Sequence, residues 1–299
     1  MDIANDIKAD APIVIEGLQK SYGAKIALQG VSAQISASGV TAILGKNGAG
    51  KTTLIKCCLG LEKISGGKVA IFGHKPGSRK ARQSLGIMLQ DTELPDLLTG
   101  SELITLFSSY YDNPLGFDEV ISLTQIGEFK DKRYKKLSGG QKRRIQFALA
   151  ITGDPDILFL DEPTTGLDTE ARKALWETVR RFAESGKTII LTTHYLEEAD
   201  TLADRIIILN DGRIVEDAPT REIQSRLGGD MIRCQTSLSL AQARAVSACL
   251  TAERSGKFTV LRTVNAATTL RDLLARDPDL SDLTVARPSL EEIFSEGTL

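Results

Sequence analysis

Short apolar runs separated by polar stretches dominate the chain from residue 13 to about residue 226. Eight of these runs have the length and β-branched character of buried or half-buried strands. They cover residues 13–18, 26–35, 40–45, 68–73, 85–90, 157–162, 188–194 and 205–210. Helical stretches lie between several of them. This alternation predicts a layered α/β domain with a mainly parallel central sheet and an added β subdomain.

The clearest helix follows the run at 157–162. Asp168 is a good N-cap residue, and Gly186 stands where the helix should end. Apolar side chains between them recur at helical spacing, namely Ala171, Leu175, Val179 and Phe182. We therefore expect one face of this helix to pack against the sheet.

Two other parts of the chain differ from this alternation of strands and helices. Residues 91–145 suggest a helical subdomain inserted into a larger domain that spans residues 13–226. After the glycine pair at 228–229 a second alternation begins, and it predicts a small α/β domain over 229–299. Ser289 and Glu292 fit a capping box, so a last helix should begin there.

The composition is that of an ordinary globular protein, with 41% hydrophobic and 25% charged residues among 299. The formal net charge of −2 gives no basic field for nucleic acid, so we expect no nucleic-acid partner. No apolar run approaches the roughly 18 residues that a membrane helix needs. The N-terminal residues lack the pattern of a signal peptide, and the four cysteines form no CxxC pair. We expect reduced thiols and a cytoplasmic location, with any membrane role supplied by a partner.

The first chemical motif lies between the run at 40–45 and a helical stretch. It reads Gly45, Lys46, Asn47, Gly48, Ala49, Gly50, Lys51 and Thr52, followed by Thr53. This is the pattern of a phosphate-binding P-loop in the strand-then-helix context it requires. Glycines let backbone N–H groups point at phosphate oxygens, and the helix N-terminus adds its positive dipole end. Lys51 should reach the β and γ phosphates, and the Thr52 hydroxyl should coordinate Mg²⁺.

A second motif ends the run at 157–162. Two consecutive acids, Asp161 and Glu162, follow a buried apolar strand, where they are costly unless a cation or hydrogen bonds meet them. Asp161 should hold the Mg²⁺ of a bound nucleotide through water. Glu162 should orient or deprotonate the attacking water.

The segment Leu137-Ser138-Gly139-Gly140-Gln141 resembles the signature motif of the ATP-binding subunits of ABC transporters. Gln90 is similar to the Q-loop glutamine of that family, Gly166-Leu167-Asp168 to its D-loop and His194 to its switch histidine. Tyr22 is similar to the aromatic residue that stacks on adenine. The resemblance covers residues 13 to about 226, with all these positions in the family's order.

This resemblance implies an ATPase with ATP and Mg²⁺ as cofactors, the metal being held by Thr52, Asp161 and Gln90. It also implies a head-to-tail homodimer, or a heterodimer with a second cassette. In such a dimer Ser138, Gly139, Gly140 and Gln141 of one chain cover the nucleotide on the P-loop of the other, and Asp168 contacts the partner. Catalysis would rest on Lys51, Glu162 and His194.

A separate integral membrane permease should then hold the chain at the cytoplasmic face of the membrane. The resemblance implies that the segment 91–106 docks this permease, with Leu97 and Leu98 as apolar contacts or as subdomain core. The tail at 288–294 resembles that of exporters for drugs, lipids or polysaccharides. An importer ATPase and a soluble ABC ATPase acting on nucleic acid or ribosomes are the alternatives.

Each motif residue outside the P-loop also has a structural interpretation. Tyr22 can simply pack, Gln90 can be a polar residue at a strand end, and His194 can be a packed or surface histidine. We interpret the basic run Lys142-Arg143-Arg144 as a solvated helix face.

Overall fold

The computed structural model describes residues 11–287 and 289–291 of the chain. The chain divides into two compact units, Met1–Asp217 and Ala218–Leu299. Helix α9 (Thr220–Gly228) belongs to the second unit, and Gly229 follows it with a positive φ of 63°. The sequence-based boundary at residues 226–229 remains a prediction.

The larger sheet of the first unit has the strand order β5-β6-β7-β3-β8-β9. Its strands are β3 (Gly39–Leu44), β5 (Leu85–Met88), β6 (Ile157–Asp161), β7 (Thr188–Thr192), β8 (Arg205–Asn210) and β9 (Arg213–Pro219). The five strands from β5 to β8 in this order are parallel. The predicted mainly parallel sheet is therefore confirmed, and only β9 was not expected.

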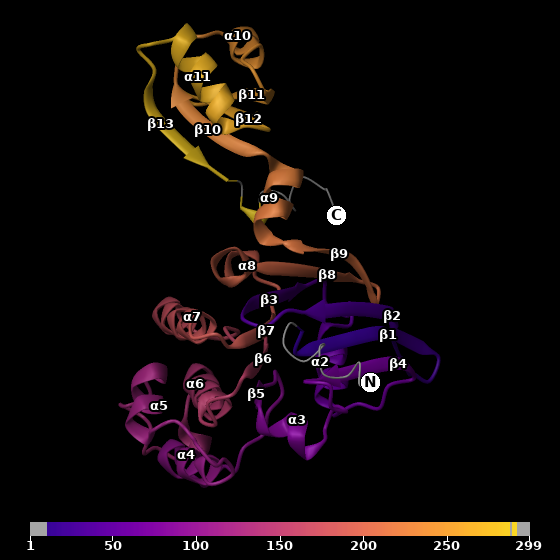
Figure 1. The fold of residues 1–299 in the computed structure, drawn as a ribbon. Coiled ribbons are helices and arrows are strands. Elements are labelled where there is room, and N and C mark those ends of the chain that lie inside the picture. The colour runs from indigo at the N-terminus through magenta and orange to yellow at the C-terminus, as the bar shows by residue number, and fades with distance from the viewer. Residues whose placement is uncertain (1–10, 288, 292–299) are drawn as a thin grey trace. The chain divides into compact units, whose positions relative to one another are not determined.

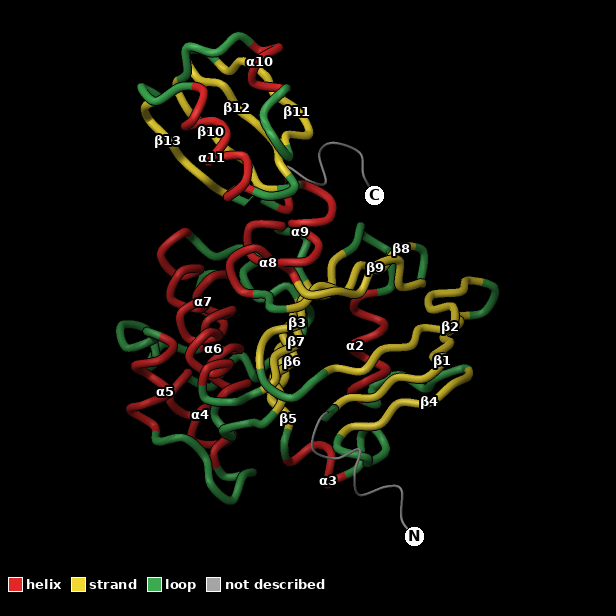
Figure 2. Tube along the Cα trace, turned by 45° about the horizontal axis from the view of Figure 1, so that its top comes forward, coloured by secondary structure: helices red, strands yellow, loops and turns green. Residues whose placement is uncertain are grey.

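A second sheet of three antiparallel strands has the order β2-β1-β4. It contains β1 (Ile13–Tyr22), β2 (Lys25–Ile35) and β4 (Gly66–Ile71). Helix α2 (Lys51–Leu59) lies between this sheet and the larger one (Figure 2). Apolar side chains of α2, including Leu54 and Ile55, join a core made from both sheets. A helix that is apolar on several sides is typical of such an enclosed position.

The other face of the parallel sheet carries α7 (Thr169–Glu184) and α8 (Leu196–Leu202) (Figure 1). The Asp168 side chain caps α7 by accepting a hydrogen bond from the Ala171 N–H at 2.8 Å. The four apolar residues predicted for one face of α7 are all buried. A short helix, α3 (Arg79–Gln83), precedes β5.

The helical subdomain contains α4 (Gly100–Ser108), α5 (Phe117–Thr124), a 3₁₀ turn (Tyr134–Lys136) and α6 (Gly139–Ile151). It has its own apolar core, built around Leu103, Ile104, Val120 and Ile145. Helix α4 begins with a capping box in which the Thr99 hydroxyl and the Glu102 carboxylate each bond the other residue's backbone N–H. Leu98 packs on this core, whereas Leu97 is 63% exposed.

The second unit contains a four-stranded antiparallel sheet with the order β11-β12-β10-β13. Its elements after α9 are β10 (Asp230–Gln235), α10 (Leu240–Arg244), β11 (Cys249–Ser255), β12 (Phe258–Thr263), α11 (Ala266–Arg276) and β13 (Ser281–Ala286). This β-α-β-β-α-β order is the ferredoxin-like arrangement. Helix α10 ends at Arg244, and the edge strand β11 begins at Cys249. Most of the helix expected from Ser289 lies outside the described residues.

Candidate nucleotide site

The P-loop connects β3 to α2, as the sequence motif requires. Gly45 and Gly50 have φ values of 156° and 107°. A Cβ at Gly45 would lie 2.3 Å from the Leu209 carbonyl oxygen, and one at Gly50 would lie 2.7 Å from that of Ala27. Neither position has room for a side chain, so glycine is required by close backbone approach as well as by conformation.

Lys51 is the first residue of α2, and only 6% of it is exposed. Its ammonium donates hydrogen bonds to the carbonyl oxygens of Gly45, at 2.6 Å, and Lys46, at 3.2 Å. Burial lowers the pKa of this ammonium, while the negative charges of Asp161 and Glu162 oppose that change. The cation is therefore held inside the curve of the loop, facing both acids.

Asp161 ends β6 and is 1% exposed. Its Oδ1 accepts hydrogen bonds from the hydroxyls of Thr52, at 3.4 Å, and Thr192. Its Oδ2 is buried and has no hydrogen-bond partner among the described residues. An orphaned carboxylate oxygen beside a threonine hydroxyl is suited to a hard cation such as Mg²⁺, which prefers oxygen ligands. The oxygen atoms of Thr52 and Asp161 therefore suit Mg²⁺ as ligands.

Glu162 has a positive φ of 50°, which is unusual for a residue other than glycine. Its N–H donates to the Thr192 carbonyl at 3.0 Å and lies 3.1 Å from the Thr192 hydroxyl. Its carboxylate lies 3.3 Å from His194 Nδ1 and 3.5 Å from Gln90 Nε2. The structure therefore brings Gln90 and His194, which lie far from Glu162 in sequence, within contact of the Glu162 carboxylate.

A cavity of about 590 Å³ joins the P-loop to these residues. It is lined by Tyr22, Lys25, Ala27, Asn47, Gly48, Gly50, Lys51, Thr52, Thr53, Gln90, Glu162 and His194. Tyr22 is 43% exposed, and the Lys20 ammonium lies 4.4 Å from its ring centroid. Lys20 itself is fixed by the Glu62 carboxylate at 2.7 Å. The aromatic ring is thus supported by a cation and remains accessible at the cavity.

The signature residues form the start of α6. The Ser138 hydroxyl accepts a hydrogen bond from the Gln141 N–H at 3.2 Å, and Gln141 Oε1 accepts one from the Ser138 N–H at 3.1 Å. This capping box leaves Gly139 and Gly140 at an N-terminal helix turn, which favours an anion. The P-loop cavity is not lined by any of the signature residues Ser138, Gly139, Gly140 and Gln141. Within one chain the two halves of the predicted site are therefore separate.

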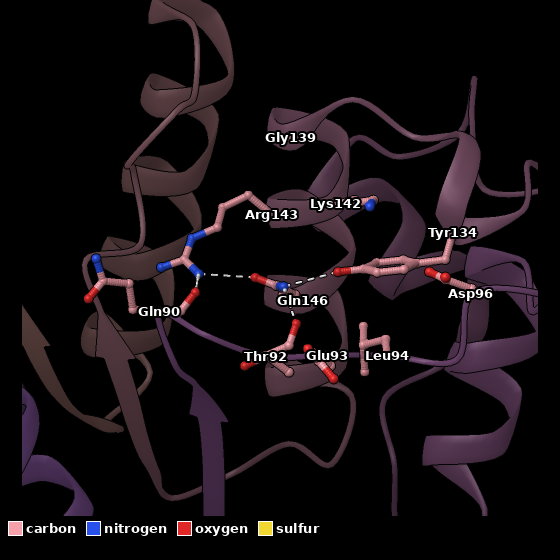
Figure 3. A pocket seen from close by; sticks show the side chains of 10 residues that line it. All are labelled: Gln90, Thr92, Glu93, Leu94, Asp96, Tyr134, Gly139, Lys142, Arg143 and Gln146. Atoms are coloured by element: carbon pink, nitrogen blue, oxygen red, sulfur yellow. Dashed lines mark hydrogen bonds between the residues drawn. The ribbon is translucent and has the colours of Figure 1, made fainter.

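A second cavity, of about 500 Å³, lies between the Gln90 loop and the helical subdomain (Figure 3). Its lining includes Gln90, Glu93, Tyr134, Lys142 and Arg143. The sequence-based interpretation of Lys142-Arg143-Arg144 as a solvated face is wrong for Arg143, which is only 7% exposed. Arg143 lies on the α6 face that also buries Gln146, Phe147 and Ala150. That i, i+3, i+4, i+7 spacing was the signal that could have identified it.

These features define the class of protein. A P-loop on a parallel sheet, with two acids at the end of a strand separated from the P-loop strand by β7, is the arrangement of a nucleoside triphosphatase. Glu162 lines the same cavity as Gln90 and His194.

Comparison with known proteins gives the family. The ABC transporter family model matches residues 28–165. The Nod factor export ATP-binding protein I of Burkholderia orbicola is 39% identical over 230 residues, which cover 74% of this chain and 76% of that protein. The daunorubicin resistance ATP-binding protein DrrA3 of Streptomyces coeruleorubidus is 33% identical over 304 residues, covering 96% and 95% of the two chains.

Solved structures agree with this assignment. An ATP-binding subunit of an ABC transporter superimposes with a TM-score of 0.66 at 26% identity, covering 72% of this chain and 92% of that one. A bacterial ABC transporter cassette solved as a dimer gives a TM-score of 0.63 at 25% identity, covering 69% and 98%. The chain belongs to the ABC transporter family, as an ATP-binding and ATP-hydrolysing subunit of the exporter type. The predicted ABC cassette fold, ATPase activity and family are thereby confirmed.

Cassettes of this family dimerise and work with a membrane subunit. Within residues 11–287 and 289–291, no helix combines the length and the apolar character that a membrane crossing requires.

Proposed function

We propose that this chain energises export as one half of an ATP-dependent cassette dimer bound to a separate permease. The observation that carries the proposal is the division of the site. Lys51, Thr52 and Glu162 line the P-loop cavity, whereas the signature turn that begins at Ser138 lies outside it. A second cassette placed head to tail supplies that turn, so nucleotide closes the interface and hydrolysis opens it.

Mg²⁺ is the metal that the site residues fit. The Thr52 hydroxyl and the Asp161 carboxylate would hold it, and Gln90 would contribute from the wall of the P-loop cavity. When bound, the metal would help to neutralise the negative charge that develops on the phosphates during transfer. Asn47, Gly48 and Gly50 present backbone to the phosphates, and Tyr22 stacks on the base.

Glu162 acts on the attacking water. Its carboxylate lies on the cavity wall and is the acceptor for a water proton, while Lys51 faces the phosphates. His194, 3.3 Å from that carboxylate, orients it and contacts the γ-phosphate. Asp168 caps α7 and contacts the second cassette from the D-loop.

The permease docks on the helical subdomain at the cytoplasmic face of the membrane. Leu97 is exposed there, whereas Leu98 is part of the subdomain core. The cavity between the Gln90 loop and α6 adjoins this surface and connects it to the site, because Gln90 lines both cavities. The relatives are named for Nod factor export and daunorubicin resistance, which supports outward transport of an organic compound.

The test is the Glu162→Gln variant with ATP and Mg²⁺. It keeps the shape of the side chain but cannot accept a water proton, so we expect ATP to bind, turnover to collapse and a stable dimer to accumulate. Light scattering after size exclusion measures the dimer, and phosphate release measures turnover. Glu197→Gln is the matched control, because Glu197 is an exposed carboxylate in α8 that does not line the cavity.

The same variant identifies the partner. Tagged Glu162→Gln protein is recovered with ATP and Mg²⁺ from detergent-solubilised membranes of its host, and its companions are identified by mass spectrometry. A polytopic membrane protein supports the proposal. Ribosomal proteins or DNA without a membrane protein would contradict it, as would unchanged turnover in Glu162→Gln.

A further inference from the structure

Arg143 is a buried cation that none of the recognised motifs includes. It lies in the second turn of α6 and is 7% exposed, and its guanidinium contacts the backbone at the carboxyl ends of β5 and β6. Burial lowers the pKa of the guanidinium, while Asp161 and Glu162 oppose that change. A buried charge of this kind needs many hydrogen bonds to be tolerated.

Both terminal nitrogens of the guanidinium donate to the backbone of two catalytic loops, whereas its Nε has no hydrogen-bond partner among the described residues. One nitrogen lies 2.5 Å from the Asp161 carbonyl oxygen and 2.7 Å from that of Glu162. The other lies 2.9 Å from the Leu89 carbonyl oxygen and 3.3 Å from that of Gln90. Strands β5 and β6 are adjacent and parallel, so their carboxyl ends deliver these four oxygens to one place.

Further hydrogen bonds link Arg143 to residues that line the cavity shown in Figure 3. Arg143 donates to Gln146 Oε1 at 3.0 Å. Gln146 Nε2 in turn donates to the Thr92 carbonyl at 3.1 Å and to the Tyr134 hydroxyl at 3.0 Å. A continuous chain of hydrogen bonds thus runs from the Glu162 backbone to the wall of the cavity between the Gln90 loop and the helical subdomain.

We propose that Arg143 is a positioning residue for ATP hydrolysis, one that fixes the Glu162 and Gln90 loops to the signature helix. This inference rests on the proposed role of Glu162 in hydrolysis. Glu162 has φ 50°, a conformation that persists only when its surroundings hold it. Thr192 binds its N–H and Arg143 binds its carbonyl, so the two contacts together set the direction of the carboxylate.

The loops of Gln90 and Glu162 should therefore move together when α6 moves. Because one planar guanidinium binds both, a shift of α6 moves the backbone of Gln90 and that of Glu162 together. Lysine carries a point charge without the planar fork, so it can hold only part of this set. Arg143 does not line the P-loop cavity, and its loss should therefore leave nucleotide affinity unchanged.

The experiment compares Arg143→Met, Arg143→Lys and the matched control Arg144→Met in the full-length protein. Arg144 is the next residue of the same helix, but its Nε donates to the Thr124 carbonyl at 3.2 Å and its guanidinium lies 4.9 Å from the Phe129 ring centroid. It therefore bears the same charge without touching the catalytic loops. Affinity is measured with a fluorescent ATP analogue, and kcat and KM are measured by phosphate release.

We expect Arg143→Met to lower kcat by about 10²-fold, the size of effect that a misplacement near 1 Å produces. Affinity and KM should stay within about twofold of wild type, since only positioning is lost. Arg143→Lys should recover part of kcat, and Arg144→Met should keep wild-type kcat. If Arg143→Met does not fold, Gln146→Leu replaces it, because that variant keeps the cation but removes the acceptor that orients it.

A kcat for the Arg143 variant equal to that of the Arg144 variant would overturn the inference. So would a fall in affinity that matches the fall in kcat, because a general structural role weakens both. Glu162→Gln, measured in parallel, separates the two proposals. If its turnover is lost while Arg143→Met is active, only the role of Arg143 fails; if Glu162→Gln is active, the proposed role of Glu162 fails first.

Discussion

Glu198 is a fully buried acid in α8, four residues after His194 in the chain. Its Oε1 accepts a hydrogen bond from the Trp176 indole at 3.1 Å. Burial raises the pKa of this carboxyl, while the Trp176 hydrogen bond, the polarity of the Thr193 and Thr164 hydroxyls and the charge of Arg172 oppose the rise. Its Oε2 has no hydrogen-bond partner among the described residues. We predict that Glu198→Gln makes the cassette more stable than wild type, by an amount that grows with pH.

The sign follows from proton binding. Above the ordinary carboxyl pKa near 4.5, the unfolded chain has lost the proton that native Glu198 still holds. Stability therefore falls as pH rises, until the native carboxyl also ionises. Glutamine does not titrate and keeps the acceptor for Trp176. Each pKa unit of the rise corresponds to about 1.4 kcal/mol in the free energy of unfolding. For a folding domain of this size, that free energy corresponds to about 3–5 °C in Tm.

The assay is thermal unfolding of wild type and variant between pH 4 and pH 9, followed by circular dichroism. The difference in Tm should be smallest at pH 4 and should rise to a plateau at higher pH. Glu197→Gln is the control, because it makes the same substitution at the neighbouring carboxylate, which is 69% exposed. Parallel Tm curves for wild type and Glu198→Gln would refute the reasoning.

Three further predictions concern ligands. Lys51→Ala removes the ammonium that faces the phosphates, so ATP affinity should fall about tenfold or more in a fluorescence titration; normal affinity would exclude the phosphate role. Tyr22→Leu should cost about 1–3 kcal/mol of base stacking, and Tyr22→Phe should retain it; equal ATP affinities for the two variants would contradict stacking. Asp161→Asn should raise the Mg²⁺ concentration needed for half-maximal ATPase activity, and an unchanged Mg²⁺ dependence would argue against the metal site.

The sequence predicted the parallel sheet well because its strands are continuous apolar runs that end at motif residues. It missed β9 because RIVEDAP mixes charges and a proline into a strand at the sheet edge, where tertiary pairing overrides propensity. It missed β11 for a similar reason, since CLTAERS is largely exposed.

The candidate site shows the same limit. Single motif positions such as Gln90 and His194 could be named from the chain, but their contacts with Glu162 depend on how β5, β6 and β7 pair. Arg143 was misjudged because a run of basic residues has the same composition whether it is solvated or bound to carbonyls. Only the positions of Asp161 and Glu162 relative to α6 reveal the difference.

The positive φ of Glu162 costs stability at a residue whose carboxylate is needed for turnover. Glycine adopts this conformation without the cost of about 1–3 kcal/mol that other residues incur. A glycine there would leave a better-relaxed cassette that lacks the carboxylate. Selection for thermal tolerance alone would therefore favour loss of activity at this position. Engineering that seeks a robust cassette must stabilise it elsewhere and leave this strained residue unchanged.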